Sequence, residues 1–222
     1  MTLTDALAAE HVLIEEVAGA LQTYVARRLA GEASADDGAR FFRFFRLWVG
    51  GYHHEREESV LFAALVERLE LPADRGPIHA LTAQHHTLAA TLEQLEALLV
   101  TAPAIAPAAH ATIDALTRAY VHGLWQHIDA ENSVLFPESA ARLRRAGLAG
   151  LGSRAPNADE LAAREDGAAL VVAFPPVHDA AALRGDGCFA CPSYGTTCEG
   201  LERTWWTASE WDEFPGHADQ LG

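Results

Sequence analysis

The chain has 222 residues, and its 31 acidic and 16 basic side chains give a formal net charge of −15 at pH 7. Such a charge disfavours duplex DNA and anionic lipid as partners, because both attract a cationic surface. Half of the residues are hydrophobic, which supports a packed core and excludes global disorder. The sequence has no run of about 20 apolar residues and does not start with a secretory signal pattern, so we expect a soluble cytoplasmic protein with no nucleic-acid or membrane partner.

The composition changes near Gly150. Residues 1–150 are rich in Ala, Leu and His on helical spacing, whereas residues 151–222 are rich in Gly, Pro and Trp and hold all three cysteines. More than half of the net charge falls after residue 150. These shifts predict a helical domain over 1–150 and a Cys/Trp-rich extension over 151–222 that packs on it.

The first part contains four stretches with helical periodicity and with start and stop signals at their ends. Their expected limits are, in chain order, Thr2 or Thr4 to Gly31, Ser34 to about Leu71, Pro77 to about Val100, and Pro107 to about Arg145. Short connections between long amphipathic helices are typical of antiparallel neighbours. The sequence therefore predicts an all-α fold, an up-down antiparallel four-helix bundle.

Each predicted helix carries one histidine on its apolar face. These histidines are His11, His53, His85 and His127. A glutamate follows two of them at i+4, on the same face: Glu57 after His53, and Glu131 after His127. A single histidine on such a face is usually a core residue. Four imidazoles and two carboxylates inside one bundle instead predict a dinuclear metal site, because buried carboxylates are costly unless a cation neutralises them.

Four segments that contain these residues resemble the helices of the hemerythrin-like, or HHE cation-binding, proteins. They are AEH at His11, HHEREESVLF at 53–62, GPIHALTAQHH at 76–86 and HIDAENSVLFP at 127–137. The resemblance covers about residues 4–146. It implies a non-haem di-iron site, bridged by the two carboxylates and an oxo or hydroxo group, with His11, His53, Glu57, His85, His127 and Glu131 as ligands. Manganese or zinc is an alternative to iron, since imidazole and carboxylate bind all three.

The third helix departs from the pattern of the oxygen-carrying hemerythrins, which use two histidines four residues apart there. The residues four positions from His85 are Leu81 and Ala89, so the site is one imidazole short. Two histidines are candidates for the missing ligand. His79 lies on the same helix, and His178 follows two prolines in the extension.

The remaining polar residues of the motifs fall off the inward faces. His54, His86 and His122 are each about 100° or more from the apolar face of their helix, so we expect them at the surface or outside the ligand set. Glu58 is expected to accept a hydrogen bond from a ligand histidine.

The extension has no counterpart in a minimal bundle of this family. The segment RAPNADELAARED favours a short helix, and four aromatic residues, Trp205, Trp206, Trp211 and Phe214, are expected to anchor the tail. Cys188, Cys191 and Cys198 leave four alternatives open. They can form a zinc site with His178 or His217, hold an iron–sulfur cluster, form a redox disulfide between the first two, or remain unconnected thiols.

Three hypotheses of function follow from the resemblance. The protein binds dioxygen, peroxide or nitric oxide as a sensor or carrier; or it is a di-iron oxygenase or oxidase with a small organic substrate; or it stores or senses iron. A closed, dry pocket would favour reversible oxygen binding, whereas a cavity with Arg or Tyr beside the metal would favour a substrate. Arg46 and Tyr120 lie about two turns from His53 and His127 and are the side chains that bear on this choice.

Overall fold

The structure is a computed structural model that describes residues 1–101 and 104–178. Within these ranges every regular element is a helix, which confirms the prediction of an all-helical fold. None of the helices in the described part of the chain is long and apolar enough to cross a membrane. The predictions for Cys188, Cys191, Cys198, His217 and the aromatic anchors of the tail lie outside the described residues.

The helical elements follow the limits expected from the sequence. They are α1 (Leu3–Leu29), α2 (Ala35–Arg43), η1 (Phe44–His54), η2 (Glu57–Phe62), α3 (Ala63–Leu69), α4 (Gly76–Leu99), η3 (Pro107–Ala109), α5 (His110–Ala130), η4 (Glu131–Leu135), α6 (Phe136–Arg145) and α7 (Ala158–Ala173). The segments η1, η2 and η4 are π-helical, and η3 is a 3₁₀ turn. Residues 35–69 are helical without a break, and so are residues 107–145.

The capping signals in the sequence fix where the first helices start and stop. The Thr2 hydroxyl accepts a hydrogen bond from the Asp5 backbone N–H, and the Asp5 carboxylate accepts one from the Thr2 backbone N–H. Ser34 and Asp37 form the same reciprocal pair at the start of α2. Gly31 follows α1 with a φ of 78°, a left-handed conformation that glycine adopts without a steric cost.

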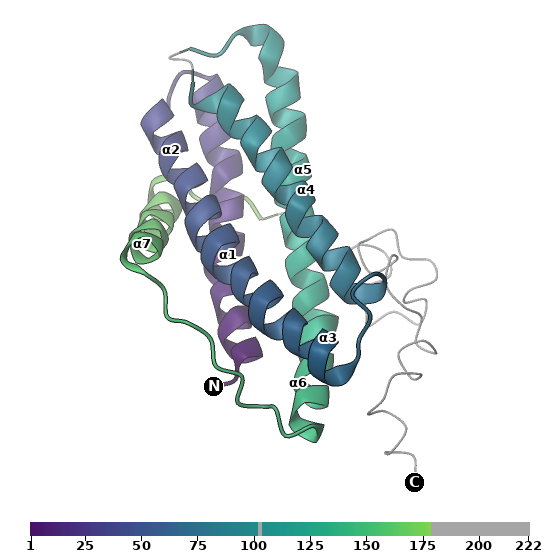
Figure 1. The fold of residues 1–222 in the computed structure, drawn as a ribbon. Helices are drawn as coiled ribbons and strands as arrows, with labels where there is room; N and C mark the ends of the chain where they lie inside the picture. Colours follow the sequence, from purple (N-terminus) through teal and green to yellow (C-terminus); the bar gives the residue numbers. More distant parts are fainter. Residues whose placement is uncertain (102–103, 179–222) are drawn as a thin grey trace.

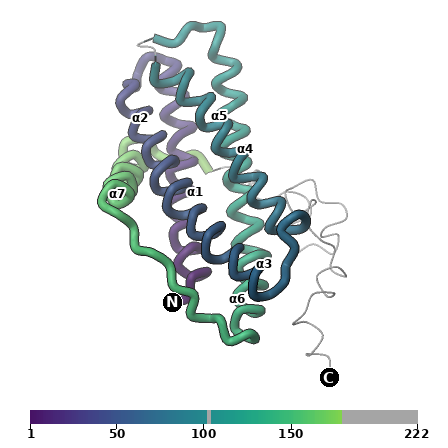
Figure 2. Tube along the Cα trace, in the orientation of Figure 1, coloured from purple at the N-terminus to yellow at the C-terminus, as the bar shows by residue number. Residues whose placement is uncertain are grey.

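The long helices lie side by side, as Figure 1 shows. The connections from α1 to α2 and from α4 to α5 lie at one end of the molecule, and the connection from α3 to α4 lies at the other (Figure 2). Helix α5 packs on both α1 and α4. The arrangement brings residues from four separate parts of the sequence to the middle of the molecule.

Helix α7 lies against the outside of α1, α2 and η1. The sequence predicted a short helix here, and the observed helix is longer because the apolar residues after Asp166 continue it to Ala173. At Gly167 the helix lies so close to η1 that a Cβ atom would lie 2.4 Å from the Phe44 ring. A residue without a side chain is therefore needed for α7 to pack at this distance.

Residues 146–157 connect α6 to α7 along the outer side of η1. Arg154 is the main contact of this segment, because its guanidinium donates to the backbone oxygen of Gly51 at 2.6 Å and pairs with Glu160 of α7 at 2.7 Å. The same guanidinium lies over the Tyr52 ring, 5.1 Å from its centre. Arg154 thus joins the connecting segment, α7 and η1.

The core consists of two apolar clusters with polar residues between them. One cluster includes Ile14 and Leu88, and the other includes Leu7 and Leu81. In the sequence, His11 lies between Leu7 and Ile14. In the same way, His85 of α4 lies between Leu81 and Leu88. The histidines therefore lie in a buried polar layer, enclosed by apolar side chains on both sides.

Candidate metal centre

The histidines expected to bind metal meet as two close pairs in this polar layer. The Nε2 atoms of His11 and His53 are 3.0 Å apart, and the Nε2 atoms of His85 and His127 are also 3.0 Å apart. Two nitrogen ligands about 2.1 Å from one cation, at a right angle to each other, would be about 3.0 Å apart. The spacing within each pair therefore fits two ligands of one metal ion.

The two glutamates lie between the histidine pairs. Glu57 contacts one histidine of each pair through different oxygens, at 3.1 Å and 3.5 Å. Glu131 does the same through Oε2, which lies 3.4 Å from His11 and 3.3 Å from His127. Each carboxylate therefore reaches both pairs, as a carboxylate that bridges two cations would.

The carboxylates are also the strongest indication that a cation belongs here. Both side chains are completely buried, and in the described part of the chain none of their four oxygens accepts a hydrogen bond of good geometry, the nearest polar atoms being the histidine nitrogens. Leaving a buried carboxylate unpaired costs several kcal/mol, and a bound cation removes this cost. Two groups of donors could each hold a metal ion: His11, His53, Glu57 and Glu131 in one, and His54, Glu57, His85 and His127 in the other.

The sequence missed His54, which was expected to face away from the site and is instead buried in it. Its ring stacks on that of His85 with a centre-to-centre distance of 3.8 Å and an angle of 12°. The expectation used the 100° spacing of an α-helix, whereas η1 is π-helical, so residues along it lie at other angles around the axis than expected. Only the doubled histidine in the sequence pointed to this arrangement.

The two histidines proposed for the missing ligand lie elsewhere. His79 is exposed on α4, and His178 is exposed with its Nε2 atom 3.6 Å from a carboxylate oxygen of Glu16. Neither belongs to the two donor groups found among the described residues. His54 supplies a third imidazole beside His85 and His127, and the role predicted for His79 or His178 as the missing ligand stays a prediction.

On the side of His53, a buried ion pair holds the imidazole in place. Its Nδ1 atom donates to Glu10 at 2.9 Å, and Glu10 in turn accepts two hydrogen bonds from Arg56, at 2.7 and 2.9 Å. Arg56 is fully buried, with its guanidinium 4.2 Å from the centre of the Tyr52 ring and its Nε atom donating to Ser153. A proton held on Nδ1 leaves Nε2 free to bind a metal.

Two other histidines are oriented by the residues that directly follow Glu57 and Glu131 in the sequence. The residue after each of these two glutamates accepts a hydrogen bond from a histidine of another helix. Glu58 accepts from Nδ1 of His85 at 2.6 Å, as expected from the sequence, and Asn132 accepts from Nδ1 of His11 at 2.9 Å. Nδ1 of His127 is buried and has no such partner among the described residues.

The cluster without metal holds protons at specific atoms. Burial opposes the charged form of His53, but Glu57 and Glu10 outweigh it and raise the pKa of His53 to about 9. Burial and the charge on His53 lower the pKa of His11 to about 4. Burial and the Glu57 carboxylate raise the pKa of Glu131 well above its usual value. In the metal-free cluster, protons are therefore held by side chains that belong to the two groups of possible metal donors.

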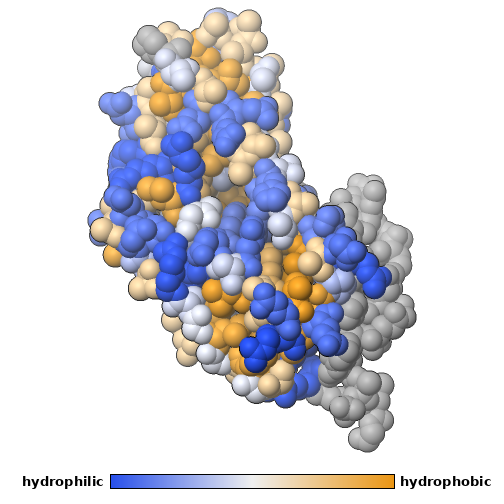
Figure 3. Space-filling view, viewed as in Figure 1, coloured by the Kyte–Doolittle hydropathy of each residue, from blue (hydrophilic) through white to orange (hydrophobic). Residues whose placement is uncertain are grey.

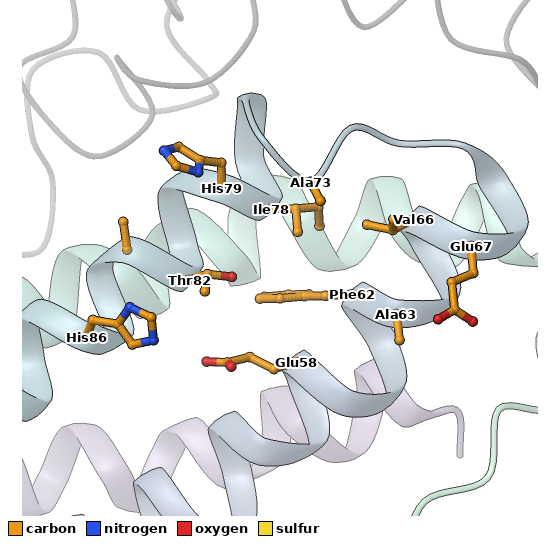
Figure 4. Close-up of a pocket in the computed structure, with 11 residues that line it drawn as sticks. Glu58, Phe62, Ala63, Val66, Glu67, Ala73, Ile78, His79, Thr82 and His86 are labelled. Atoms are coloured by element: carbon orange, nitrogen blue, oxygen red, sulfur yellow. The ribbon is translucent and has the colours of Figure 1, made fainter.

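Two cavities reach this region from the surface. Figure 4 shows the first, of about 470 Å³, in which Glu58 and His86 lie on opposite sides and Phe62 lies between α4 and α3. The second, of about 220 Å³, lies between η1 and α4 and is lined by His54 and His85. Arg46 and Tyr120, the two side chains singled out in the sequence, both line this second cavity.

A family model described as the hemerythrin HHE cation binding domain matches residues 2–139. This range contains both donor groups and the residues that orient their histidines. Comparisons with curated proteins and with solved structures gave no match.

Proposed function

Because the chain belongs to the hemerythrin HHE cation-binding family, we propose that its buried cluster holds two iron ions and that the loaded protein binds or reacts with dioxygen or a related small oxidant, such as peroxide or nitric oxide. In this proposal the family's antiparallel four-helix bundle has four members. The first is α1, the second is the continuous run from α2 to α3, the third is α4, and the fourth is the continuous run from α5 to α6. Helix α7 is an addition to this bundle.

The observation that carries this proposal is the relation of the two carboxylates to the two histidine pairs. Glu57 and Glu131 each contact both pairs, and their four oxygens are buried without a hydrogen bond from any described residue. A single cation could satisfy one pair only. Two cations that share both carboxylates satisfy all of these donors.

The two donor groups would hold the iron, which in its reduced state would supply electrons to a small oxidant. The side chains of the protein set the conditions for this chemistry. Glu10, Asn132 and Glu58 accept the Nδ1 protons of three histidines and so aim their Nε2 atoms inward. Phe136 stacks on His11 and Phe62 on His85, so an aromatic ring covers one histidine of each pair.

A second candidate function is an oxygenase or oxidase with a small organic substrate. The cavity of about 220 Å³ between η1 and α4 favours it, because His54 and His85 line that cavity. A protein that only binds a diatomic molecule has no need for a space of this size beside its metal ligands.

Metal analysis and optical spectra test the proposal. We expect about two iron ions per chain and a change in the optical spectrum when the anaerobically reduced protein is exposed to air. A stable spectrum that reverses on removal of oxygen supports the carrier or sensor, whereas a short-lived one supports the enzyme. Full iron content in both Glu57→Ala and Glu131→Ala would contradict the assignment. His86→Ala is the matched control, since His86 is an exposed histidine outside both donor groups.

A further inference from the structure

We propose that the cavity between η1 and α4 is a binding pocket for a small, uncharged organic molecule with an apolar body and one hydrogen-bond acceptor. The inference deepens the proposed function, because a molecule bound there would lie beside the proposed metal position at His54 and His85. Binding itself requires only the cavity, so it can be tested without metal.

The cavity has a buried inner end and an exposed mouth. The buried residues that line it include Phe45, Val49, Leu88, Leu92 and Tyr120, together with the two stacked histidines. The exposed residues that line it include Arg46, Ala89 and Glu93. In Figure 3 hydrophobic side chains are visible in a recess beside α4, with hydrophilic side chains around it. The space therefore leads from solvent to the candidate metal centre.

The size and walls of the cavity favour a small apolar body. Its volume is about 220 Å³, which is below the roughly 300–1,000 Å³ of pockets for drug-sized ligands. Most of its buried lining is aliphatic or aromatic, so an apolar molecule that displaces water from it gains hydrophobic free energy. A compact molecule with one ring or a short chain fits this space.

The charges at the mouth disfavour anions. Arg46 is already paired with Glu96, with 2.9 Å between Nη2 and Oε1, and Glu93 adds a second carboxylate to the lining. The formal charge of the mouth is therefore negative. A cation would be attracted to the mouth, but it would lose its hydration inside walls that offer no further carboxylate. An uncharged molecule is not repelled by the negative mouth and does not lose the hydration of a charge inside the cavity.

Tyr120 supplies the hydrogen bond. Its side chain is 3 % exposed and lines the cavity, and no hydrogen bond joins its hydroxyl to another of the described residues. The Phe45 ring packs edge-on against the Tyr120 ring at 5.1 Å and holds it in place. The hydroxyl is not one of the buried atoms shut off from solvent, so it faces the cavity and is free to donate there. An acceptor on a bound molecule would take this hydrogen bond in place of water.

Binding of three fluorinated probes, measured by ¹⁹F NMR on the metal-free and the iron-loaded full chain, tests the proposal. 4-Fluoroacetophenone is uncharged and carries one acceptor, fluorobenzene carries none, and 4-fluorobenzoate is an anion. We expect the ketone to bind most tightly and the anion least. Tyr120→Phe should weaken the ketone about fivefold and leave fluorobenzene unchanged, as for the loss of one hydrogen bond.

Two substitutions on the exposed side of α4 locate the binding. Ala89 lies at the mouth of the cavity, whereas the neighbouring Ala90 is equally exposed and does not line it. We expect Ala89→Phe to weaken the ketone tenfold or more, and Ala90→Phe to bind as the unsubstituted chain does. Equal binding in both variants, or an anion that binds as tightly as the ketone, would overturn the proposal. A chain that binds the probes but fails to take up iron when iron is supplied would support the pocket and contradict the proposed function.

Discussion

The imidazole of His54 stacks on that of His85 at 3.8 Å, although one belongs to η1 and the other to α4. This contact places three imidazoles, from His54, His85 and His127, around Glu57. The other donor group has two imidazoles and two carboxylates. The two candidate metal positions therefore differ in charge and in ligand type.

His54→Ala should remove metal from one position more than from the other. We expect the iron content to fall by about half, because the group with His11 and His53 keeps all its donors. Iron analysis of the purified variant, with His122→Ala as a control outside the donor groups, measures this. An unchanged iron content and optical spectrum would mean that His54 only packs against His85.

Replacing Arg56 by Met should destabilise the metal-free protein by about 1–3 kcal/mol, because the partly buried Glu10 carboxylate loses two hydrogen bonds from Arg56 and keeps only His53 as a partner. Urea unfolding of the variant measures this change. The double variant Arg56→Met with Glu10→Gln should recover part of the loss, since no unpaired charge remains. A double variant that is less stable by the sum of the two single losses would contradict this account.

Metal binding should release protons at pH 7. The pKa of His53 is raised to about 9, so its imidazole is protonated at neutral pH and a cation must displace one proton. Since His11 has a pKa lowered to about 4, it is already neutral and releases none. Calorimetry with Mn²⁺ in two buffers of different ionisation enthalpy counts the protons. The affinity should rise as the pH increases from about 6.5 to about 9, and a constant affinity over this range would contradict the prediction.

The same pKa shift has a definite sign for stability. The folded metal-free protein holds the His53 proton more tightly than the unfolded chain, whose histidines titrate near 6.5. The contribution of this group is therefore fully present below pH 6.5 and is lost as the pH rises through about 9. Replacement of His53 by Gln should remove this part of the pH dependence, as measured by urea unfolding at several pH values.

Gly167→Ala should destabilise the protein by about 1–3 kcal/mol. The new methyl group would lie 2.4 Å from the Phe44 ring, so α7 or the ring has to move. Gly152→Ala is the matched control, because nothing lies within 4 Å of a Cβ atom there. Thermal unfolding of both variants decides the matter, and equal midpoints would show that α7 does not depend on this contact.

The sequence predicted the helices well because their signals are local. Reciprocal caps such as Thr2 with Asp5 mark helix starts, and the i+4 spacing of His53 with Glu57 and of His127 with Glu131 places both side chains on one face. These relations depend on residues within one or two turns of each other. These caps and i+4 pairs therefore do not depend on how the rest of the chain folds.

The residues that sequence reasoning missed depend on contacts between helices or on altered helical geometry. The position of His54 was predicted from the 100° spacing of an α-helix, whereas η1 is π-helical and places its residues at other angles. Glu10 and Arg56 meet from two different helices, and neither sequence position indicates the other. The extent of α7 was underestimated because its last residues are apolar and carry no capping signal.

The contact of Arg154 with the Gly51 backbone oxygen gives the connecting segment a role in the geometry of the histidines. Gly51 lies two residues before His53 in η1, so the segment holds the wide helical turn from outside. A chain shortened to residues 1–145 would keep every donor of both groups and still lose this outer support. We therefore expect such a chain to bind metal with poorer selectivity between ions of different size, because selectivity depends on how rigidly the ligands are held.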